Sequence, residues 1–184
     1  MNESLLSGRY AKALLAQAIE EGQDEVLYPI LKHLSQTLRS HLGAKGVVDN
    51  PTLSEELRAE FVVALAGEEA PLLLKRFVGL VFEHGREALL GEISRAYVGL
   101  YRRHRGITYA RITTARGMDD IARRQLKDLL AREFGGEVEM DEILDELLLG
   151  GFVIRVDGKQ MDASVKGQLE RIRNQFLSRN KSIV

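Results

Sequence analysis

The chain has 184 residues, of which 45% are hydrophobic, and its 26 basic and 27 acidic residues give a formal net charge of −1. This length and hydrophobic content exclude an intrinsically disordered chain and allow one domain or two small ones. The near-zero charge argues against binding of nucleic acid by bulk positive charge. Because cysteine is absent, disulfides, thiolate zinc sites and cysteine nucleophiles are excluded. No apolar stretch approaches the roughly 20 residues that span a bilayer, and the charged N-terminus does not fit a signal peptide. We therefore expect a soluble, unexported chain.

Residues 1–105 are predicted to form a succession of five helices. Hydrophobic residues recur there at the spacing of one helical face, beginning with Leu6, Tyr10 and Leu14. The helix boundaries are predicted at turn and capping residues, namely Glu20 to Gly22, Asp24, Pro29 in a first turn, Gly43 with Gly46, Ser54, Gly67, Pro71 and Gly85. Since the connections are short, neighbouring helices should be antiparallel, which favours a helical bundle.

Residues 106–184 are predicted to form a small α+β domain of order β-α-β-β-α. Ile107 to Thr114 alternates and is rich in β-branched residues, which indicates a strand. A helix is expected from Met118 to Phe134 with Asp119 as its cap. Its expected apolar face comprises Ile121, Ala122, Leu126, Leu129, Leu130 and Phe134. A short strand at 138–140 and a hairpin at Asp157-Gly158 follow. Ser164 is expected to cap a last helix with Val165, Leu169, Ile172 and Phe176 on one face.

The sequence contains no recognisable catalytic constellation. His33, His41, His84 and His104 are scattered without metal-ligand spacing, and neither phosphate-binding glycine motif nor a serine-nucleophile motif occurs. Six carboxylates between Glu137 and Glu146 are compatible with a loose Mg²⁺ or Ca²⁺ site in a metal-assisted hydrolase, but they lack the EF-hand pattern. A solvated acidic face is the favoured interpretation, so we expect no catalytic residue, no metal ligand and no cofactor.

Two further features have alternative interpretations. The basic run Arg102 to Arg105 either contacts nucleic acid, in a helical adaptor, or complements the dipole at a helix C-terminus; we favour the second. Gly150-Gly151 either approaches a ligand or makes a tight entry into a strand; again the structural interpretation is favoured. The residues alone therefore predict a non-enzymatic interaction module.

Several stretches resemble the delta subunit family of F-type ATP synthases, which includes the oligomycin-sensitivity-conferring protein. Residues 9–14 read R-Y-A-K-A-L as in that family, and residues 83–86 resemble its E-N-G-R turn with His84 for Asn. Thr113-Thr114-Ala115 is similar to its T-S-A strand end. Residues 145–151 resemble its D-P-x-L-I-G-G pattern, and residues 161–169 its I-D-G-S-V-R-G-K-L pattern. Glu146 replaces the proline and Ala163 a glycine.

The resemblance implies a mainly α fold, with an N-terminal bundle over 1–105 and an α+β domain over 106–184. The family's bundle has six helices, so the stretch from Leu38 to Val48 is expected to contain a break and a short extra helix. The implied role is that of a non-catalytic stator subunit, which ties the catalytic head to the peripheral stalk. It implies a monomer within the complex, held peripherally at the cytoplasmic face of the bacterial cell membrane.

The resemblance also implies two partners. An N-terminal helix of the alpha subunit is received in an apolar groove between the first and fifth helices, and the C-terminal domain meets the stalk's b subunit. The residues expected to line the alpha groove are Tyr10, Ala13, Leu14, Phe77, Val78 and Val81. The b-subunit contact is expected on the last helix and the strands beside it, with Gly150, Gly151, Asp162 and Ser164 as fold determinants.

Overall fold

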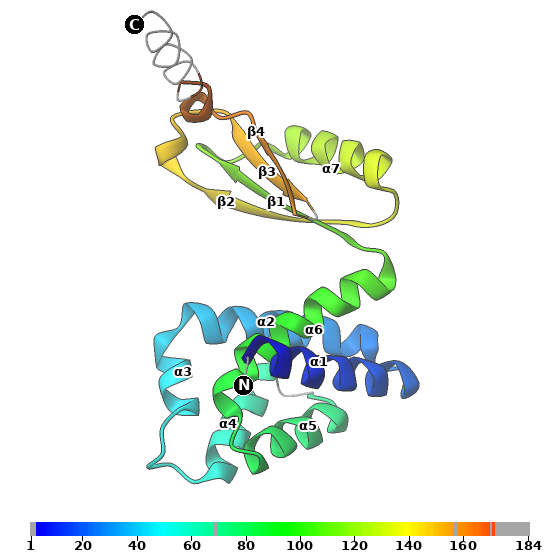
Figure 1. Cartoon of the computed structure of the whole chain (residues 1–184), viewed down its shortest axis with the longest axis vertical. Coiled ribbons are helices and arrows are strands. Elements are labelled where there is room, and N and C mark those ends of the chain that lie inside the picture. The colour runs from blue at the N-terminus through cyan, green and yellow to red at the C-terminus, as the bar shows by residue number, and fades with distance from the viewer. Residues whose placement is uncertain (1–2, 68–69, 157, 170, 172–184) are drawn as a thin grey trace, which may run out of the picture. The chain divides into compact units, whose positions relative to one another are not determined.

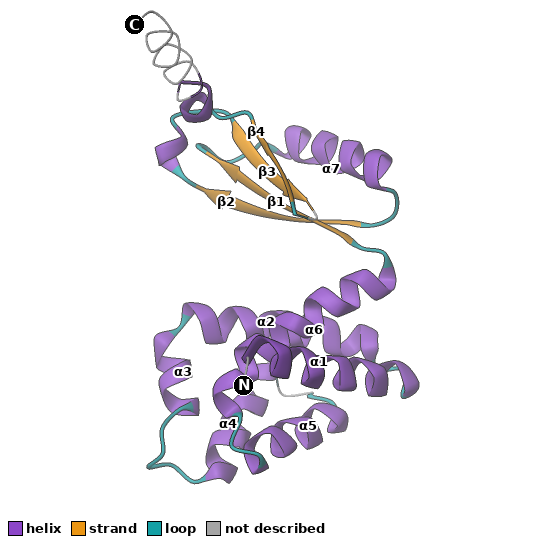
Figure 2. Ribbon diagram, viewed as in Figure 1, coloured by secondary structure: helices purple, strands orange, loops and turns teal. Residues whose placement is uncertain are grey.

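A computed structural model of the chain describes residues 3–67, 70–156, 158–169 and 171 (Figure 1). The chain divides into two compact units, Met1–His104 and Arg105–Val184. The first unit is helical, and the second combines a four-stranded sheet with helices (Figure 2). The predicted fold class, a helical bundle followed by a small α+β unit, is confirmed. None of the described helices is both long and apolar enough to span a membrane.

The helical unit contains six described α-helices. They are α1 (Glu3–Glu20), α2 (Asp24–Ser40), α3 (Leu42–Val48), α4 (Glu55–Ala66), α5 (Leu72–Glu83) and α6 (Leu90–Arg105), with a 3-10 turn η1 (Glu87–Leu89) before α6. The predicted break between Leu38 and Val48 is present, because α2 ends at Ser40 and α3 begins at Leu42. Ser54 caps α4 as predicted, since its hydroxyl accepts from the Leu57 N–H at 3.2 Å.

Two details of the helix prediction were wrong. Pro29 was expected in the first turn of its helix, but α2 begins at Asp24 and the proline lies one turn further in. Asp24 was expected to cap α2, but Gln23 is the N-cap residue and makes no side-chain cap hydrogen bond. Asp24 is instead buried, and its backbone carbonyl accepts a long hydrogen bond from the Tyr97 hydroxyl at 3.5 Å.

The core of the helical unit combines aliphatic side chains with stacked tyrosines. Leu27, Leu31 and Leu34 of α2 are fully buried against other helices of the unit, as is Tyr97 of α6. Tyr101 stacks on Tyr28 with ring centroids 4.3 Å apart. Such aromatic contacts add to the free energy gained from apolar burial alone, so the tyrosines help to hold α2 and α6 together.

A buried arginine links three further elements of the helical unit. Arg58 of α4 is only 7% exposed. It donates to Glu87 at 2.7 Å and to the Val48 carbonyl at 3.1 Å, and it lies over the Phe82 ring at 5.3 Å. A charged group with so little access to water is retained only when it is paired. Arg58 therefore ties α4 to three other elements: α3 through Val48, α5 through Phe82 and η1 through Glu87.

The C-terminal unit contains a four-stranded sheet in the order β2-β1-β3-β4. Its elements are β1 (Thr108–Thr114), α7 (Asp120–Phe134), β2 (Val138–Leu144), the 3-10 turn η2 (Glu146–Leu148), β3 (Phe152–Val156) and β4 (Lys159–Asp162). β1 pairs in parallel with β2 and antiparallel with β3, and β3 forms the predicted hairpin with β4. Asp119 caps α7 as predicted, accepting from the Ala122 N–H. β2 is longer than the predicted strand at 138–140.

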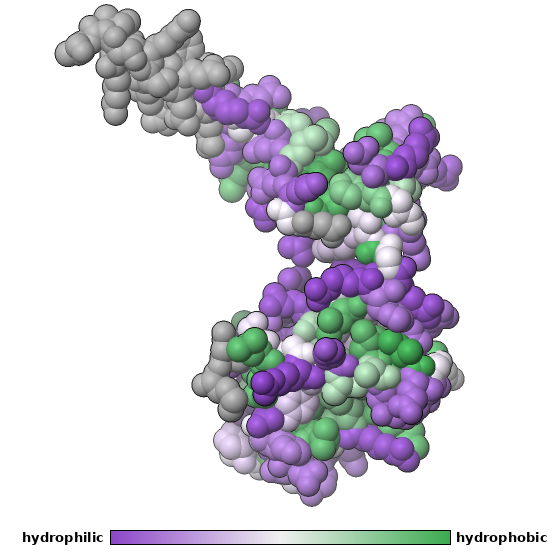
Figure 3. All heavy atoms as spheres, turned by 45° about the vertical axis from the view of Figure 1, so that its right-hand side comes forward, coloured by the Kyte–Doolittle hydropathy of each residue, from purple (hydrophilic) through white to green (hydrophobic). Residues whose placement is uncertain are grey.

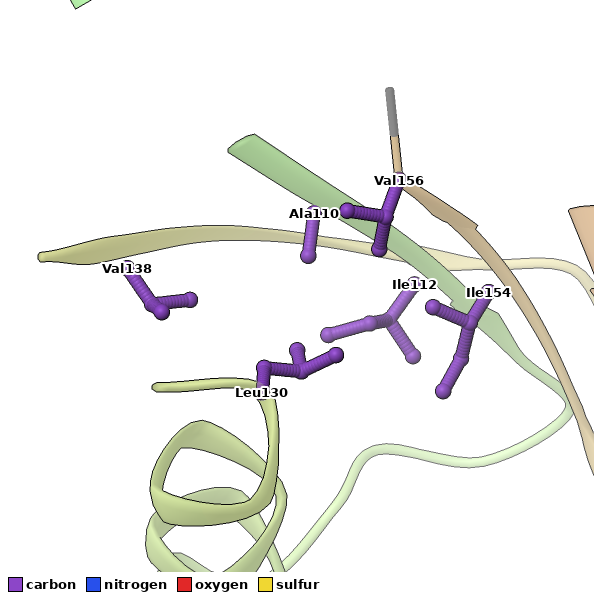
Figure 4. Packing of buried hydrophobic residues seen from close by; sticks show 6 residues of the cluster. All are labelled: Ala110, Ile112, Leu130, Val138, Ile154 and Val156. Atoms are coloured by element: carbon purple, nitrogen blue, oxygen red, sulfur yellow. The ribbon is translucent and has the colours of Figure 1, made fainter. Parts of the chain in front are cut away.

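The hydrophobic core of the C-terminal unit lies between the sheet and α7. Side chains from β1, β2 and β3 point toward Leu130 of α7 (Figure 4). The cluster consists of Ala110, Ile112, Leu130, Val138, Ile154 and Val156. The apolar face predicted for α7 is only partly correct, because Ile121 and Leu129 are 71% and 60% exposed. Among the described residues predicted for that face, only Leu130 is buried, at 6% exposure.

The motif at residues 145–151 contacts the motif at residues 161–169 at the start of the last helix. Gly151 has a φ of +72°, and a Cβ there would lie 3.0 Å from Ser164 Cα and closer still to the Ala163 carbonyl oxygen. The Val165 N–H donates to the Gly150 carbonyl at 3.0 Å. The Asp162 carboxylate accepts from the Ser164 N–H and hydroxyl, and that hydroxyl accepts from the Gly167 N–H. We name this contact the Gly151–Ser164 junction. The expected cap at Ser164 is present, whereas Ile172 and Phe176 lie outside the described residues.

Candidate functional site

A groove lies between α1 and α5 of the helical unit. Each helix contributes residues at the spacing i, i+3, i+4, i+7, which is one continuous helical stripe. Its volume is about 610 Å³. Its lining residues are Arg9, Tyr10, Ala13, Leu14, Gln17, Leu73, Arg76, Phe77, Leu80 and His84. We call this surface the α1–α5 groove. In Figure 3 hydrophobic residues gather on one face of the helical unit, with hydrophilic residues around them.

The floor of the groove is apolar and well packed, while part of its wall is open. Leu14, Leu73 and Phe77 are buried, at 2%, 8% and 8% exposure. Ala13 is exposed, and Leu80 is 44% exposed. A small residue at position 13 lets another backbone approach closely, and an exposed leucine loses contact with water when a partner covers it. The groove therefore has the shape and chemistry to receive the apolar side of a helix.

Tyr10 is held in place by two neighbours. Its ring meets the Phe77 ring edge-on, with centroids 6.2 Å apart. The Arg86 guanidinium lies over the same ring at 5.4 Å and donates to the Tyr10 hydroxyl. The ring is thereby fixed before any partner binds, which reduces the entropy lost on association. Arg86 was not predicted as a supporting residue from the sequence, although it falls in the 83–86 turn motif.

Four of the six predicted groove residues lie together and two do not. Tyr10, Ala13, Leu14 and Phe77 all line the groove. Val78 and Val81 do not, because they are 1% and 0% exposed in the interior of the helical unit. The physical reason is that α5 is apolar on nearly all sides, so its face toward the bundle and its face toward the groove read alike. Prediction also missed Leu73 and Leu80, which share the stripe of Phe77.

The C-terminal unit has its own apolar concavity beside α7. It has a volume of about 800 Å³ and lies where β1 ends, next to the residues that open β3. The side chains that line it include Met118 and Leu149 of the loops, Leu126 and Leu129 of α7, and Phe152 of β3. Leu129 and Leu149 are 60% and 71% exposed. Their exposure makes this surface a second candidate for contact with another protein.

The acidic stretch 137–146 was expected to form a single solvated face. It does not, because the alternation of strand β2 places neighbouring carboxylates on opposite faces of the sheet. Glu142 accepts from the Met118 N–H at 2.7 Å and from Arg123 at 2.9 Å, and these contacts lower the pKa of its carboxyl group. Asp141 lies on the opposite face of the sheet and accepts from the Tyr109 hydroxyl at 2.8 Å. The described residues include no group of three or more potential metal ligands.

The basic run at 102–105 ends helix α6, as the structural interpretation expects. Arg102 donates to the Tyr28 hydroxyl at 2.9 Å, and Arg103 Nε reaches the Gly99 carbonyl at 3.4 Å. These contacts tie two of the arginines to the helical unit itself. They give no support to the alternative of a nucleic-acid adaptor. His33, His41, His84 and His104 are all exposed.

Sequence comparisons identify the family. A family model described as ATP synthase delta (OSCP) subunit matches residues 6–176. The ATP synthase subunit delta of Parabacteroides distasonis is 34% identical over 177 residues, covering 96% of this chain and 98% of the relative. That of Bacteroides thetaiotaomicron is 32% identical and covers 100% of both chains.

Structure comparison agrees at the level of the fold. A chain from the Toxoplasma gondii mitochondrial ATP synthase hexamer aligns with a TM-score of 0.74, covering 94% of this chain and 97% of that one at 20% sequence identity. At this low sequence identity, the match is evidence for a shared fold only. Together with the full-length relatives and the family match, these observations lead to one conclusion: the chain belongs to the ATP synthase delta (OSCP) family.

Proposed function

We propose that the chain is a non-catalytic stator subunit of an F-type ATP synthase, joining the catalytic head to the peripheral stalk. Family membership supports the role, and the α1–α5 groove is the observation that carries its first contact. In this proposal the groove receives an amphipathic helix at the N-terminus of the alpha subunit. The chain itself stays peripheral at the cytoplasmic face of the membrane, held there through the complex.

The groove is long enough to contact several turns of a partner helix. Helix α5 has 12 residues and is therefore about 18 Å long at 1.5 Å per residue. A partner helix lying along it makes contact over about three turns. Tyr10 and Phe77 provide rigid aromatic contacts, and Ala13 leaves space for the partner's backbone. Such central aromatic residues dominate the binding free energy of many interfaces.

The second contact is proposed for the C-terminal unit, with the b subunit of the stalk as partner. Exposed hydrophobic residues of this unit support it, among them Leu144, Leu147 and Leu149 at 64%, 73% and 71% exposure. A stator must hold its partners under torque, which favours slow dissociation through buried apolar area. The proposal needs no cofactor and no chemical step.

The test of the groove is calorimetry of the full chain with a peptide from the N-terminus of its own organism's alpha subunit. We expect one-to-one binding with a negative change in heat capacity, because apolar surface is buried. Leu80→Ala removes an exposed groove side chain and should weaken binding about tenfold, which is the usual effect of losing ~1.4 kcal/mol.

Leu72→Ala is the matched control for this experiment. Leu72 lies on the same helix and is 59% exposed, but it does not line the groove. The Leu72→Ala variant should bind the peptide with an unchanged dissociation constant. Equal losses of affinity in the two variants would show that the groove is not the binding surface. Absence of binding by the unaltered folded chain would contradict the proposed alpha contact altogether.

A further inference from the structure

The lining of the α1–α5 groove carries charge of one sign only. Besides its apolar residues it includes the two arginines Arg9 and Arg76, and it includes no aspartate or glutamate. This bias is local, because the whole chain has a net charge of −1. At one end of the lining, Gln17 donates to Glu21, which directly follows α1, at 2.9 Å.

The two arginines are available for a partner. Both are exposed, and neither forms an ion pair or a hydrogen bond with another described residue. Some other arginines of the described surface are paired, for example Arg95 with Glu92 and Arg123 with Asp120. The groove therefore leaves the positive charge of both arginines uncompensated beside apolar side chains.

The arginines occupy equivalent places on the two helices. Arg9 directly precedes Tyr10 on α1, and Arg76 directly precedes Phe77 on α5. Because Tyr10 and Phe77 contact each other, each aromatic residue of the floor has a cation next to it in sequence. A helix seated on this floor meets one positive charge from each of the two groove-forming helices.

From this arrangement we propose that the α1–α5 groove selects an amphipathic helix whose apolar stripe is flanked by aspartate or glutamate, with Arg9 and Arg76 pairing with those carboxylates. The inference rests on the proposed function, because it specifies the chemistry of the alpha segment that enters the groove. Apolar burial supplies most of the affinity, while the charge pairs fix the register of the helix and speed its association.

The experiment compares two double variants of the full chain that lose the same charge. Arg9→Gln with Arg76→Gln removes the groove arginines. Lys12→Gln with Lys75→Gln removes two exposed lysines from the same two helices, neither of which lines the groove. Each double variant is titrated with the alpha N-terminal peptide at low and high salt. A second peptide, with every Asp and Glu replaced by Asn and Gln, is titrated in parallel.

The arginine variant should bind the native peptide about fivefold more weakly at low salt, since two exposed ion pairs are lost. Its affinity should no longer fall as salt is raised, because the screened charges are gone. The lysine variant should behave as the unaltered chain does. The neutralised peptide should bind the unaltered chain as weakly as the native peptide binds the arginine variant.

Four results would overturn the proposal. Binding of both peptides with equal affinity would leave apolar contact as the whole interaction, with the proposed stator function intact. Equal losses in the arginine and lysine variants would show a long-range effect of net charge. A dimer of the chain that depends on Arg9 and Arg76, seen by sedimentation, would make a second copy the occupant. Failure of the unaltered chain to bind either peptide would instead count against the proposed alpha contact and this inference together.

Discussion

The Gly151–Ser164 junction gives the sharpest test of how the C-terminal unit is held together. Gly151→Ala places a methyl group where the backbone of residues 163 and 164 already lies. The left-handed φ alone costs a non-glycine residue about 1 kcal/mol. To admit the methyl group the junction must also open. This breaks the Ala163–Phe152 and Val165–Gly150 hydrogen bonds, each 3.0 Å long and each worth about 1 kcal/mol.

We therefore expect Gly151→Ala to lower the free energy of unfolding of the C-terminal unit by about 3 kcal/mol. Gly158→Ala is the control, because Gly158 also has a positive φ, of +80°, but a Cβ there meets no atom within 4 Å outside its chain neighbours. That variant should lose only about 1 kcal/mol. The difference between the two losses therefore measures the cost of the steric contact at Gly151, separately from the cost of the left-handed φ.

Urea titration followed by NMR is the suitable assay, because a chain with two units need not unfold in one step. The signals of Ala110 report on the C-terminal unit and those of Ala11 on the helical unit, since both residues are fully buried. With a slope of about 1 kcal/mol per M urea, the two glycine variants should differ by about 2 M in the midpoint at Ala110. The midpoint at Ala11 should be unchanged. Equal midpoints at Ala110 for the two variants would refute the reasoning.

Three further predictions concern side-chain networks. The pKa of Glu142 is lowered from 4.5 in the folded state, so its contribution is present at neutral pH and is lost as the pH falls below about 4.5; Glu142→Gln should flatten the acid limb of the unfolding profile at Ala110, and an unaltered limb would contradict this. Arg58→Met should destabilise the helical unit by about 3 kcal/mol in urea, because it leaves the Glu87 carboxylate partly buried without its cation, and restoration by the added change Glu87→Met would identify that carboxylate as the cause. Arg86→Gln and Tyr10→Phe should each weaken alpha-peptide binding about threefold by calorimetry, and the double variant should be no worse than either, since both remove one support; additive losses would show that Arg86 acts elsewhere.

Much of the fold follows from local patterns. Helical spacing, the caps at Ser54 and Asp119 and the alternation in β1 each depend on neighbouring residues, and the structure confirms them. The hairpin between β3 and β4 is likewise a local feature. These elements are predictable because their signals lie within a few residues of one another.

The errors arose where distant segments decide the outcome. On α5, Phe77 and Val78 are equally apolar, and only the packing of the bundle decides that one faces the groove and the other the interior. No prediction was made from the sequence for Arg58, whose burial depends on Glu87, 29 positions away. In the same way, exposure of Leu129 follows from how little of α7 the sheet covers.

The order of strands in the C-terminal unit bears on how it would carry load. The segment that leaves the helical unit enters β1, and β1 is an inner strand, paired along its length with β2 and for five residues with β3. A pull directed along β1 acts on the hydrogen bonds to both neighbours at once, in shear. An edge strand pulled away sideways would instead lose its bonds one after another. In a subunit proposed to resist torque between two partners, tension delivered through the other unit is thus shared by two ladders of hydrogen bonds.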